Sequence, residues 1–273
     1  MSIDDTAIAS STPAQTVDTV SKPIKVAWGA GALGVSVLMN SVSFLVMFYM
    51  VGVLHIEPAL AGTLIFATKL LDVVSDPVVG IWSDRISSRI GRRRPFLIPG
   101  AILSAIALAL IFTTPVFETQ AFTATYIFCA LLIYTIGYTV FNVPYMAMPA
   151  EMTDSYHERS SIHAYRVVFV TMGSFLASSV APWTLETLGK TEWSSYATLG
   201  VCGAIIVFAS MFVSFLGTGR ARHLPSGAAI PDIRADLKAA LTNGYFLRLA
   251  GVKACQLLGV AASSAAMVFF IVN

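Results

Sequence analysis

Long apolar stretches separated by short polar connections run through most of this chain. Several of them approach or exceed the ~20 residues that an α-helix needs to cross the hydrocarbon core of a bilayer. Apolar residues follow one another within each stretch, which is typical of membrane helices and not of alternating barrel strands. The pattern predicts membrane-spanning helices over residues 26–54, 59–81, 96–112, 122–148, 162–185 and 196–216. The fourth span contains Pro144, and we expect the helix to be interrupted there.

Four segments follow from this pattern. Residues 1–21 are polar and rich in Ser, Thr and Ala, and we expect a disordered cytoplasmic tail. Residues 22–217 form the six-helix transmembrane bundle. Residues 218–243 are a connecting loop that contains a surface helix with apolar spacing over PDIRADLKAAL. Residues 244–273 begin a seventh span, so the chain is expected to hold the N-terminal half of a larger molecule and the start of a truncated C-terminal half.

Composition places the chain among all-α polytopic membrane proteins. Hydrophobic residues make up 56% and charged residues 12%, about half the ~25% charged residues of soluble domains. The net charge of +2 and the location of basic residues in short loops give no support for a nucleic-acid partner. Cys129, Cys202 and Cys255 fall inside predicted spans, and we expect small buried residues with no disulfide or metal framework.

Basic residues concentrate on one side of the predicted membrane. Loops on the cytoplasmic side carry an excess of Lys and Arg. Here one set of connections holds the basic residues Lys22, Lys25, Arg85, Arg89, Arg92, Arg93, Arg94, Arg159, Arg220, Arg222, Arg234 and Lys238. The opposite connections hold almost none except Lys190. The N-terminus is therefore predicted to be cytoplasmic, in a multi-pass protein of the cell (inner) membrane.

Two carboxylates lie one helical turn apart inside the second span. Asp72 and Asp76 share a helix face, and a charge at membrane depth costs at least ~2.5–3.5 kcal/mol on insertion scales. Such residues persist where they face a polar cavity and bind a ligand, and a cation is the natural ligand for paired carboxylates. Neutralisation by Lys69 in a structural ion pair is the alternative. One lysine cannot neutralise two carboxylates, so some negative charge remains.

Further polar side chains lie in or near the predicted spans. Asn40, Tyr138 and Asn142 offer hydrogen-bonding groups for a substrate or for a neighbouring helix. Arg166, near the start of the fifth span, either extends from the helix end to the interface or lies near the substrate. The sequence has no nucleophile elbow, phosphate-binding glycine loop or Cys–His metal spacing, so an enzyme or ATP-driven pump is not expected.

Two long motifs resemble those of the glycoside–pentoside–hexuronide:cation symporters of the major facilitator superfamily. Residues 72–95 read DVVSDPVVGIWSDRISSRIGRRRP and residues 141–154 read FNVPYMAMPAEMTD. The run WGAGALG at 28–34, ER at 158–159 and AYR at 164–166 agree with the same family. The resemblance implies two six-helix halves with the site between them at the midplane.

The resemblance also implies roles for particular residues. Asp72 and Asp76 would hold the coupling ion, Na⁺, Li⁺ or H⁺, with Asp72 and Asp76 as Na⁺ ligands in a sodium-coupled protein. Ser75 occupies a position that sets cation selectivity in the family. Ser36 and Asn142 stand where some sugar-transporting relatives carry acids, which leaves galactoside recognition open. Asp84, Arg85, Arg92 and Glu151 belong to a cytoplasmic gating motif.

The sequence thus predicts a secondary transporter that couples a monovalent cation to a glycoside or related sugar by alternating access, with no cofactor besides the ion. One alternative keeps the fold and changes the substrate to a lipid-like or drug-like molecule, since Ser36 and Asn142 stand in place of the two acids of sugar-transporting relatives. Another is a transport-incompetent N-terminal fragment.

Overall fold

The computed structural model describes residues 19–86, 88, 90–115, 117–189, 192–221, 242–253, 255, 256 and 259. The chain divides into two units, Met1–Ser226 and Gly227–Asn273. The first contains the helices that concern the site. In the second, residues 244–253 are helical. The tail before residue 19 and the expected surface helix over 231–241 lie outside the described residues.

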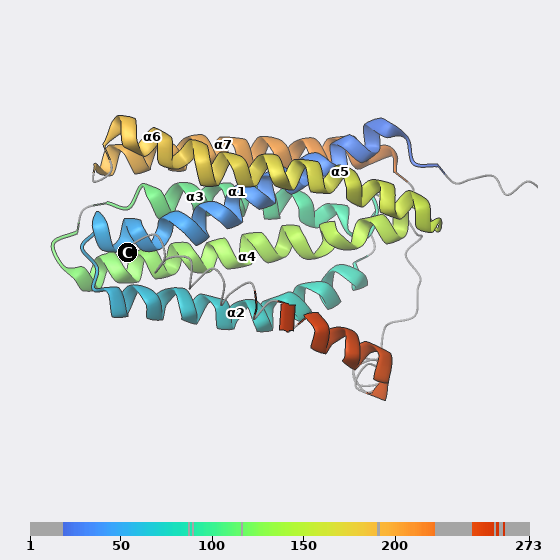
Figure 1. The fold of residues 1–273 in the computed structure, drawn as a ribbon, viewed down its shortest axis with the longest axis horizontal. Helices are drawn as coiled ribbons and strands as arrows, with labels where there is room; N and C mark the ends of the chain where they lie inside the picture. Colours follow the sequence, from blue (N-terminus) through green and yellow to red (C-terminus); the bar gives the residue numbers. More distant parts are fainter. Residues whose placement is uncertain are drawn as a thin grey trace, which may run out of the picture. The chain divides into compact units, whose positions relative to one another are not determined.

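The first unit is built from long helices that run along a common direction (Figure 1). The helices are α1 (Lys22–Gly52), α2 (Pro58–Arg85), α3 (Leu97–Phe112), α4 (Gln120–Met152), α5 (Tyr156–Phe175), α6 (Ala181–Leu188) and α7 (Trp193–Gly217). Short 3₁₀ turns, η1 (Arg94–Phe96) and η3 (Thr218–Arg220), precede α3 and follow α7. A π-helical turn, η2 (Leu176–Val180), joins α5 to α6 so that the three form one continuous rod.

The all-helical class predicted from the sequence is confirmed. In the described part of the chain, five helical segments are long and apolar enough to cross a membrane: Lys22–Gly52, Arg94–Phe112, Gln120–Met152, Tyr156–Leu188 and Trp193–Arg220. The remaining long helix, α2, has 28 residues and carries Lys69, Asp72 and Asp76 in its interior. At 1.5 Å per residue its length of roughly 40 Å also exceeds the ~30 Å hydrocarbon core.

The predicted interruption at Pro144 is wrong. Helix α4 continues through Pro144 and Pro149 to Met152. A proline in a helix lacks the N–H that would bond to the carbonyl four residues earlier, yet both prolines are buried and α4 packs against α2 and α3. Packing on two sides holds the helix straight enough to continue. Asn142 therefore lies on a regular helix and not beside a broken turn.

Helix α1 lies between α5 and α7, and α3 lies between α4 and α7. Helix α2 packs mainly on α4, with a smaller contact to α1. The order of neighbours is thus α5, α1, α7, α3, α4, α2. This arrangement leaves the half of α2 that faces away from α4 exposed, including Phe66, Val73 and Val78.

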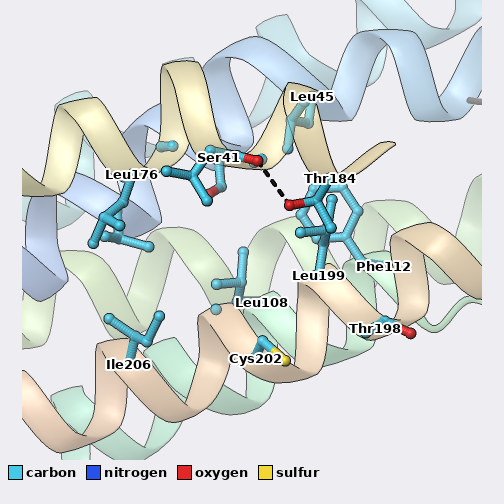
Figure 2. Close-up of a pocket in the computed structure, with 15 residues that line it drawn as sticks. Ser41, Leu45, Leu108, Phe112, Leu176, Thr184, Thr198, Leu199, Cys202 and Ile206 are labelled. Carbon is cyan, nitrogen blue, oxygen red and sulfur yellow. Dashed lines mark hydrogen bonds between the residues drawn. The ribbon is translucent and has the colours of Figure 1, made fainter. Parts of the chain in front are cut away.

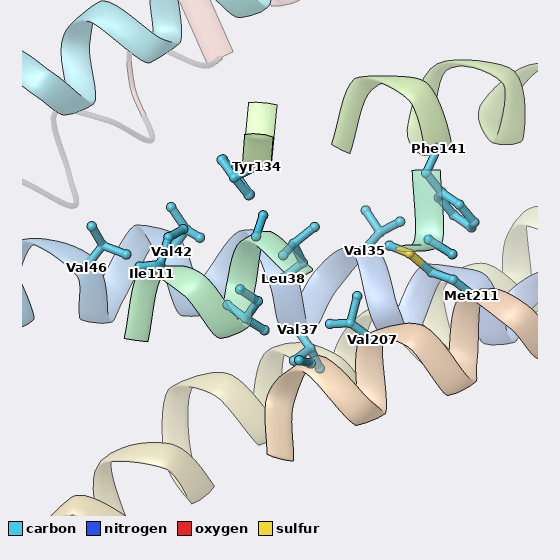
Figure 3. Close-up of a cluster of buried hydrophobic side chains, with 14 of the residues drawn as sticks. Val35, Val37, Leu38, Val42, Val46, Ile111, Tyr134, Phe141, Val207 and Met211 are labelled. Carbon is cyan, nitrogen blue, oxygen red and sulfur yellow. The ribbon is translucent and has the colours of Figure 1, made fainter. Parts of the chain in front are cut away.

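The buried core follows helical spacing along α1. Val35, Leu38, Val42 and Val46 recur every three or four residues and are at most 9% exposed. Figure 3 shows them meeting Ile111 of α3, Tyr134 and Phe141 of α4, and Val207 and Met211 of α7. The apolar faces of α1, α3, α4 and α7 therefore form one core.

Helices α3 and α4 approach each other at two glycines. A Cβ atom added to Gly100 would lie 2.6 Å from the backbone nitrogen of Phe141, and one added to Gly137 would lie 2.7 Å from the backbone nitrogen of Ser104. Small residues at helix crossings allow such close backbone contact in membrane proteins. These glycines bring α4, and the polar residues that it carries, against the rest of the bundle.

The prediction that the cysteines are buried is wrong. Cys129, Cys202 and Cys255 are all exposed. The reason is physical: in a bilayer the outer surface of a helix bundle is as apolar as its core, so hydrophobicity does not indicate burial.

Candidate functional site

Asp76 lies near the middle of α2 and faces α4. Its Oδ1 atom accepts a hydrogen bond of 2.8 Å from Oγ1 of Thr139, whose side chain is fully buried. This bond joins the two helices at membrane depth. The partner of Asp76 is a neutral hydroxyl, so the hydrogen bond does not neutralise the carboxylate.

Asp72 lies one turn before Asp76 and has a charged partner. Lys69 Nζ is 2.9 Å from Asp72 Oδ2, and the side chains of Lys69 and Asp72 are 53% and 20% exposed. The other carboxylate oxygen, Oδ1, is buried and has no hydrogen-bond partner. The expected ion pair therefore forms, but it uses one oxygen of one acid.

The described residues around this face supply oxygen atoms. Ser75 Oγ lies 3.4 Å from Thr139 Oγ1 and 3.4 Å from the backbone oxygen of Asp72. Two carboxylates and two hydroxyls thus share one region between α2 and α4, and Lys69 pairs with one of the carboxylates. Oxygen ligands suit hard cations. Within the described part of the chain, no three His, Cys, Asp or Glu side chains gather as a metal cluster would require.

Thr139 was not anticipated from the sequence. Nothing in its local sequence distinguishes it from the other threonines of α4, such as Thr135. The only available signal was its helical register, because Thr139 lies three residues before Asn142. Its role follows from the contact between α4 and α2.

Asn142 and Tyr138 lie one turn apart on α4, next to the acidic face of α2. Asn142 Nδ2 donates to the hydroxyl of Tyr138 at 3.2 Å. Asn142 Oδ1 is buried without a hydrogen-bond partner. A buried carbonyl oxygen without a donor is costly and is available to a ligand hydroxyl or a water molecule.

Ser36 and Asn40, which are predicted substrate residues, bond to each other and to α5. Asn40 Nδ2 contacts the Ser36 backbone oxygen at 2.8 Å, Ser36 Oγ at 3.1 Å and Ser174 Oγ at 3.1 Å. Ser36 Oγ donates to the Val170 backbone oxygen at 2.9 Å. The bonds to Ser174 and to Val170 join α1 to α5. Ser174 was not identified from the sequence.

Arg166 lies three turns inside α5, because α5 begins at Tyr156 and not at residue 162. The alternative in which Arg166 extends from the helix end to the membrane interface is therefore less favoured than it was from the sequence. The side chain is half-buried, and its Nε atom has no acceptor among the described residues. No ion pair of Arg166 occurs in the part of the chain that the structure describes.

A second cluster of charges lies where α2 and α4 end. Arg92 contacts Glu151 at 2.8 Å and Asp84 at 3.7 Å. Arg93 contacts Asp84 at 3.1 Å and Glu151 at 3.2 Å. The Glu151 side chain is 5% exposed. The turn that carries the arginines contains Gly91 with φ of 102°, a conformation that favours glycine.

Arg85 is a correction to the predicted gating set. It ends α2, is exposed, and makes no ion pair with any described residue. Arg93, which is not in the predicted gating set, pairs with both acids of the cluster. The difference arises because the last turn of α2 points Asp84, and not Arg85, toward α4.

Comparison with known proteins identifies relatives. The family described as MFS/sugar transport protein matches residues 27–273. The putative glycoside/cation symporter YagG of Escherichia coli K12 is 29% identical over 227 residues, which cover 81% of this chain and 48% of the relative. The isoprimeverose transporter of Lactiplantibacillus pentosus is 26% identical over 233 residues, covering 84% and 48%.

A third relative differs in its named cargo. The sodium-dependent lysophosphatidylcholine symporter 1 of Mus musculus is 27% identical over 160 residues, covering 57% of this chain and 30% of the relative. The chain spans about half the length, or less, of these three relatives. With its family match and its apolar helices, it is an integral multi-pass membrane protein that belongs to the MFS/sugar transport protein family, whose matched relatives are symporters and transporters and not enzymes.

Proposed function

We propose that this chain serves cation-coupled symport of a glycoside or related sugar by alternating access. Asp72 and Asp76 hold the coupling ion, Na⁺ or H⁺, and Ser75 and Thr139 contribute hydroxyl oxygens beside them. One observation carries the proposal: Lys69 pairs with one oxygen of Asp72, while Asp76 has only a neutral donor among the described residues. The face therefore keeps one negative charge that a monovalent cation can neutralise.

Electrostatics explains how such an ion promotes transport. An uncompensated carboxylate inside a membrane bundle is costly, and a bound cation removes that cost. If the cation raises the affinity for sugar, sugar raises the affinity for the cation by the same factor. This linkage supports coupling without direct contact between the two ligands.

The substrate residues follow from the contacts on α4 and α5. The unpartnered oxygen of Asn142 accepts a sugar hydroxyl, and Tyr138 beside it supplies an apolar ring and a hydroxyl. Arg166 supplies donors for sugar oxygens. Asn40 and Ser36 contribute to the substrate site indirectly, by fixing the position of α1 against α5. They bond to each other and to residues of α5.

The charged cluster of Asp84, Arg92, Arg93 and Glu151 acts as the cytoplasmic gate in this proposal. It supports closure on that side because the ion pairs join the ends of α2 and α4, and their separation opens a path. The excess of basic residues at the same end supports a cytoplasmic N-terminus.

The test measures sugar uptake in cells that express the gene encoding this chain, with the sodium and proton gradients varied separately. Asp76→Asn removes the unneutralised charge, so we expect gradient-driven accumulation to be lost while the protein still reaches the membrane. Cation dependence that survives in both Asp72→Asn and Asp76→Asn excludes these residues as the coupling site.

A lipid-like substrate is the second proposal, favoured by the match to the sodium-dependent lysophosphatidylcholine symporter 1. It keeps the cation site and replaces the sugar. Asn142 and Ser36 stand where some sugar-transporting relatives carry acids, so this chain lacks two carboxylates that would suit a hydroxyl-rich ligand. Uptake of radiolabelled glycosides and of a lysophospholipid under the same sodium gradient separates the two, since each proposal requires its own cargo to saturate.

A further inference from the structure

An apolar pocket of about 230 Å³ lies between α1, α3, α7 and the rod formed by η2 and α6 (Figure 2). Leu108 and Phe112 of α3 line its inner wall and are 1% and 2% exposed. Cys202 and Ile206 of α7 line its outer side and are exposed. The pocket is therefore a recess with a lateral mouth between α7 and the η2–α6 rod, on elements other than the α2–α4 acids.

The only polar side-chain oxygens that line this pocket belong to Ser41, Thr184 and Thr198, all in the described part of the chain. None of its lining residues, all within the described chain, is charged. Thr184 donates to the Val180 backbone oxygen at 2.8 Å and Thr198 to the Ser194 backbone oxygen at 2.9 Å. Two of the three hydroxyls are thus already bonded within their own helices, so a sugar would leave most of its own hydroxyls unpaired.

Trp193 indicates how deep in the membrane the mouth lies. It begins α7 and is 42% exposed. Tryptophan concentrates at the membrane–water interface. The lining segment of α7, from Thr198 to Ile206, begins five residues later, so it lies roughly 7–20 Å beyond Trp193 at 1.5 Å per residue. The mouth therefore opens at the level of lipid acyl chains.

The recess arises from local structure. A π-helical turn inserts an extra residue per turn and shifts the faces that follow it, and η2 contains Ala177 and Val180 of the lining. Gly203 on the opposing wall has no side chain to fill the gap. Interiors are otherwise close-packed, and an apolar cavity of 150 Å³ stays dry and takes up hydrocarbon.

We propose that this pocket binds one acyl chain of a membrane lipid, which enters between α7 and the η2–α6 rod. Hydrocarbon is the medium at the mouth, it matches the apolar lining, and it needs no hydrogen-bond donor or acceptor. The site is separate from the proposed transport site and does not depend on which substrate is carried.

The experiment uses the full chain in proteoliposomes that contain a phospholipid with a diazirine near the middle of one acyl chain. Photolysis releases N₂ and leaves a carbene that inserts into nearby C–H bonds, and peptide mass spectrometry locates the adducts. We expect adducts on Leu108 and Phe112. Lipid that only surrounds the bundle cannot reach these residues, because they are buried.

A matched pair of variants tests the mouth. Cys202→Trp places a large ring in the opening, whereas Val201→Trp places it on a neighbouring exposed position that does not line the pocket. If the new ring keeps two methylene groups of the acyl chain out of the pocket, lipid binding weakens about tenfold. Adducts on Leu108 should fall by about that factor in Cys202→Trp and remain unchanged in Val201→Trp.

A second measurement needs no variant. Labelling of a bound site saturates as the mole fraction of probe lipid rises, while labelling of exposed Phe208, which does not line the pocket, increases in proportion. Saturable labelling of Leu108 or Phe112 supports the site. Adducts confined to exposed residues, or labelling of Leu108 that rises linearly like that of Phe208, overturn the proposal.

Discussion

Thr139 of α4 donates a hydrogen bond of 2.8 Å to Asp76 of α2. The hydroxyl is fully buried, so the bond forms in a region of low dielectric constant where an unpaired group is expensive. It orients one carboxylate oxygen and leaves the charge in place. The pair thus connects the packing of two helices to the electrostatics of the proposed cation site.

Removal of this donor tests its importance. Thr139→Val keeps the shape and removes the hydroxyl, and an unsatisfied buried group costs about 1–3 kcal/mol. We expect the half-saturating cation concentration in uptake assays to change by at least about fivefold. Thr135→Val is the matched control, since the Thr135 hydroxyl is buried on the same helix without a partner. Equal effects of both variants would contradict a specific role for Thr139.

The ion pair between Lys69 and Asp72 distinguishes cation binding from structural neutralisation. Suppose that Asp72 serves only to neutralise Lys69. The double variant Lys69→Met/Asp72→Asn then restores the coupled uptake that Asp72→Asn loses, because no charge is left unpaired. If Asp72 binds the ion, the double variant stays uncoupled although the protein accumulates normally. Uptake with and without a sodium or proton gradient, together with membrane abundance, decides between the two.

The charged cluster at the ends of α2 and α4 is expected to contribute to stability. Glu151 contacts both Arg92 and Arg93 and is 5% exposed, and removing one partner of a buried ion pair costs about 3–5 kcal/mol. Glu151→Gln should therefore lower the midpoint of thermal unfolding in detergent. Arg85→Gln, at an exposed and unpaired position in the described chain, should change stability by no more than about 0.5 kcal/mol.

Helix contact at Gly100 gives a prediction independent of charge. In Gly100→Ala the new Cβ would lie 2.6 Å from the Phe141 backbone nitrogen, so α3 and α4 must separate. Overpacking of this kind costs about 1–3 kcal/mol. Gly62→Ala on α2 meets nothing within 4 Å and should stabilise the helix by about 0.5–1 kcal/mol. Thermal unfolding of both variants checks the difference, and a Gly100→Ala protein as stable as the parent would contradict the close approach.

Sequence alone determined which segments form helices and where charge lies within them. Continuous apolar runs specify membrane helices because the bilayer leaves backbone groups no partners except one another. The spacing of Asp72 and Asp76 placed both on one face, since helical periodicity is local. The family resemblance, and not helical spacing, grouped Asp84, Arg92 and Glu151, which the structure joins by ion pairs.

Only tertiary structure decided which groups meet across helices. Thr139 and Ser174 have no distinguishing local sequence, and each acquires its role from a contact between helices far apart in the chain. Pro144 shows the same limit, because packing against neighbours overrode its local tendency to break the helix. Helix formation depends on near neighbours along the chain, whereas partner choice depends on rotation and crossing of whole helices, which no single segment encodes.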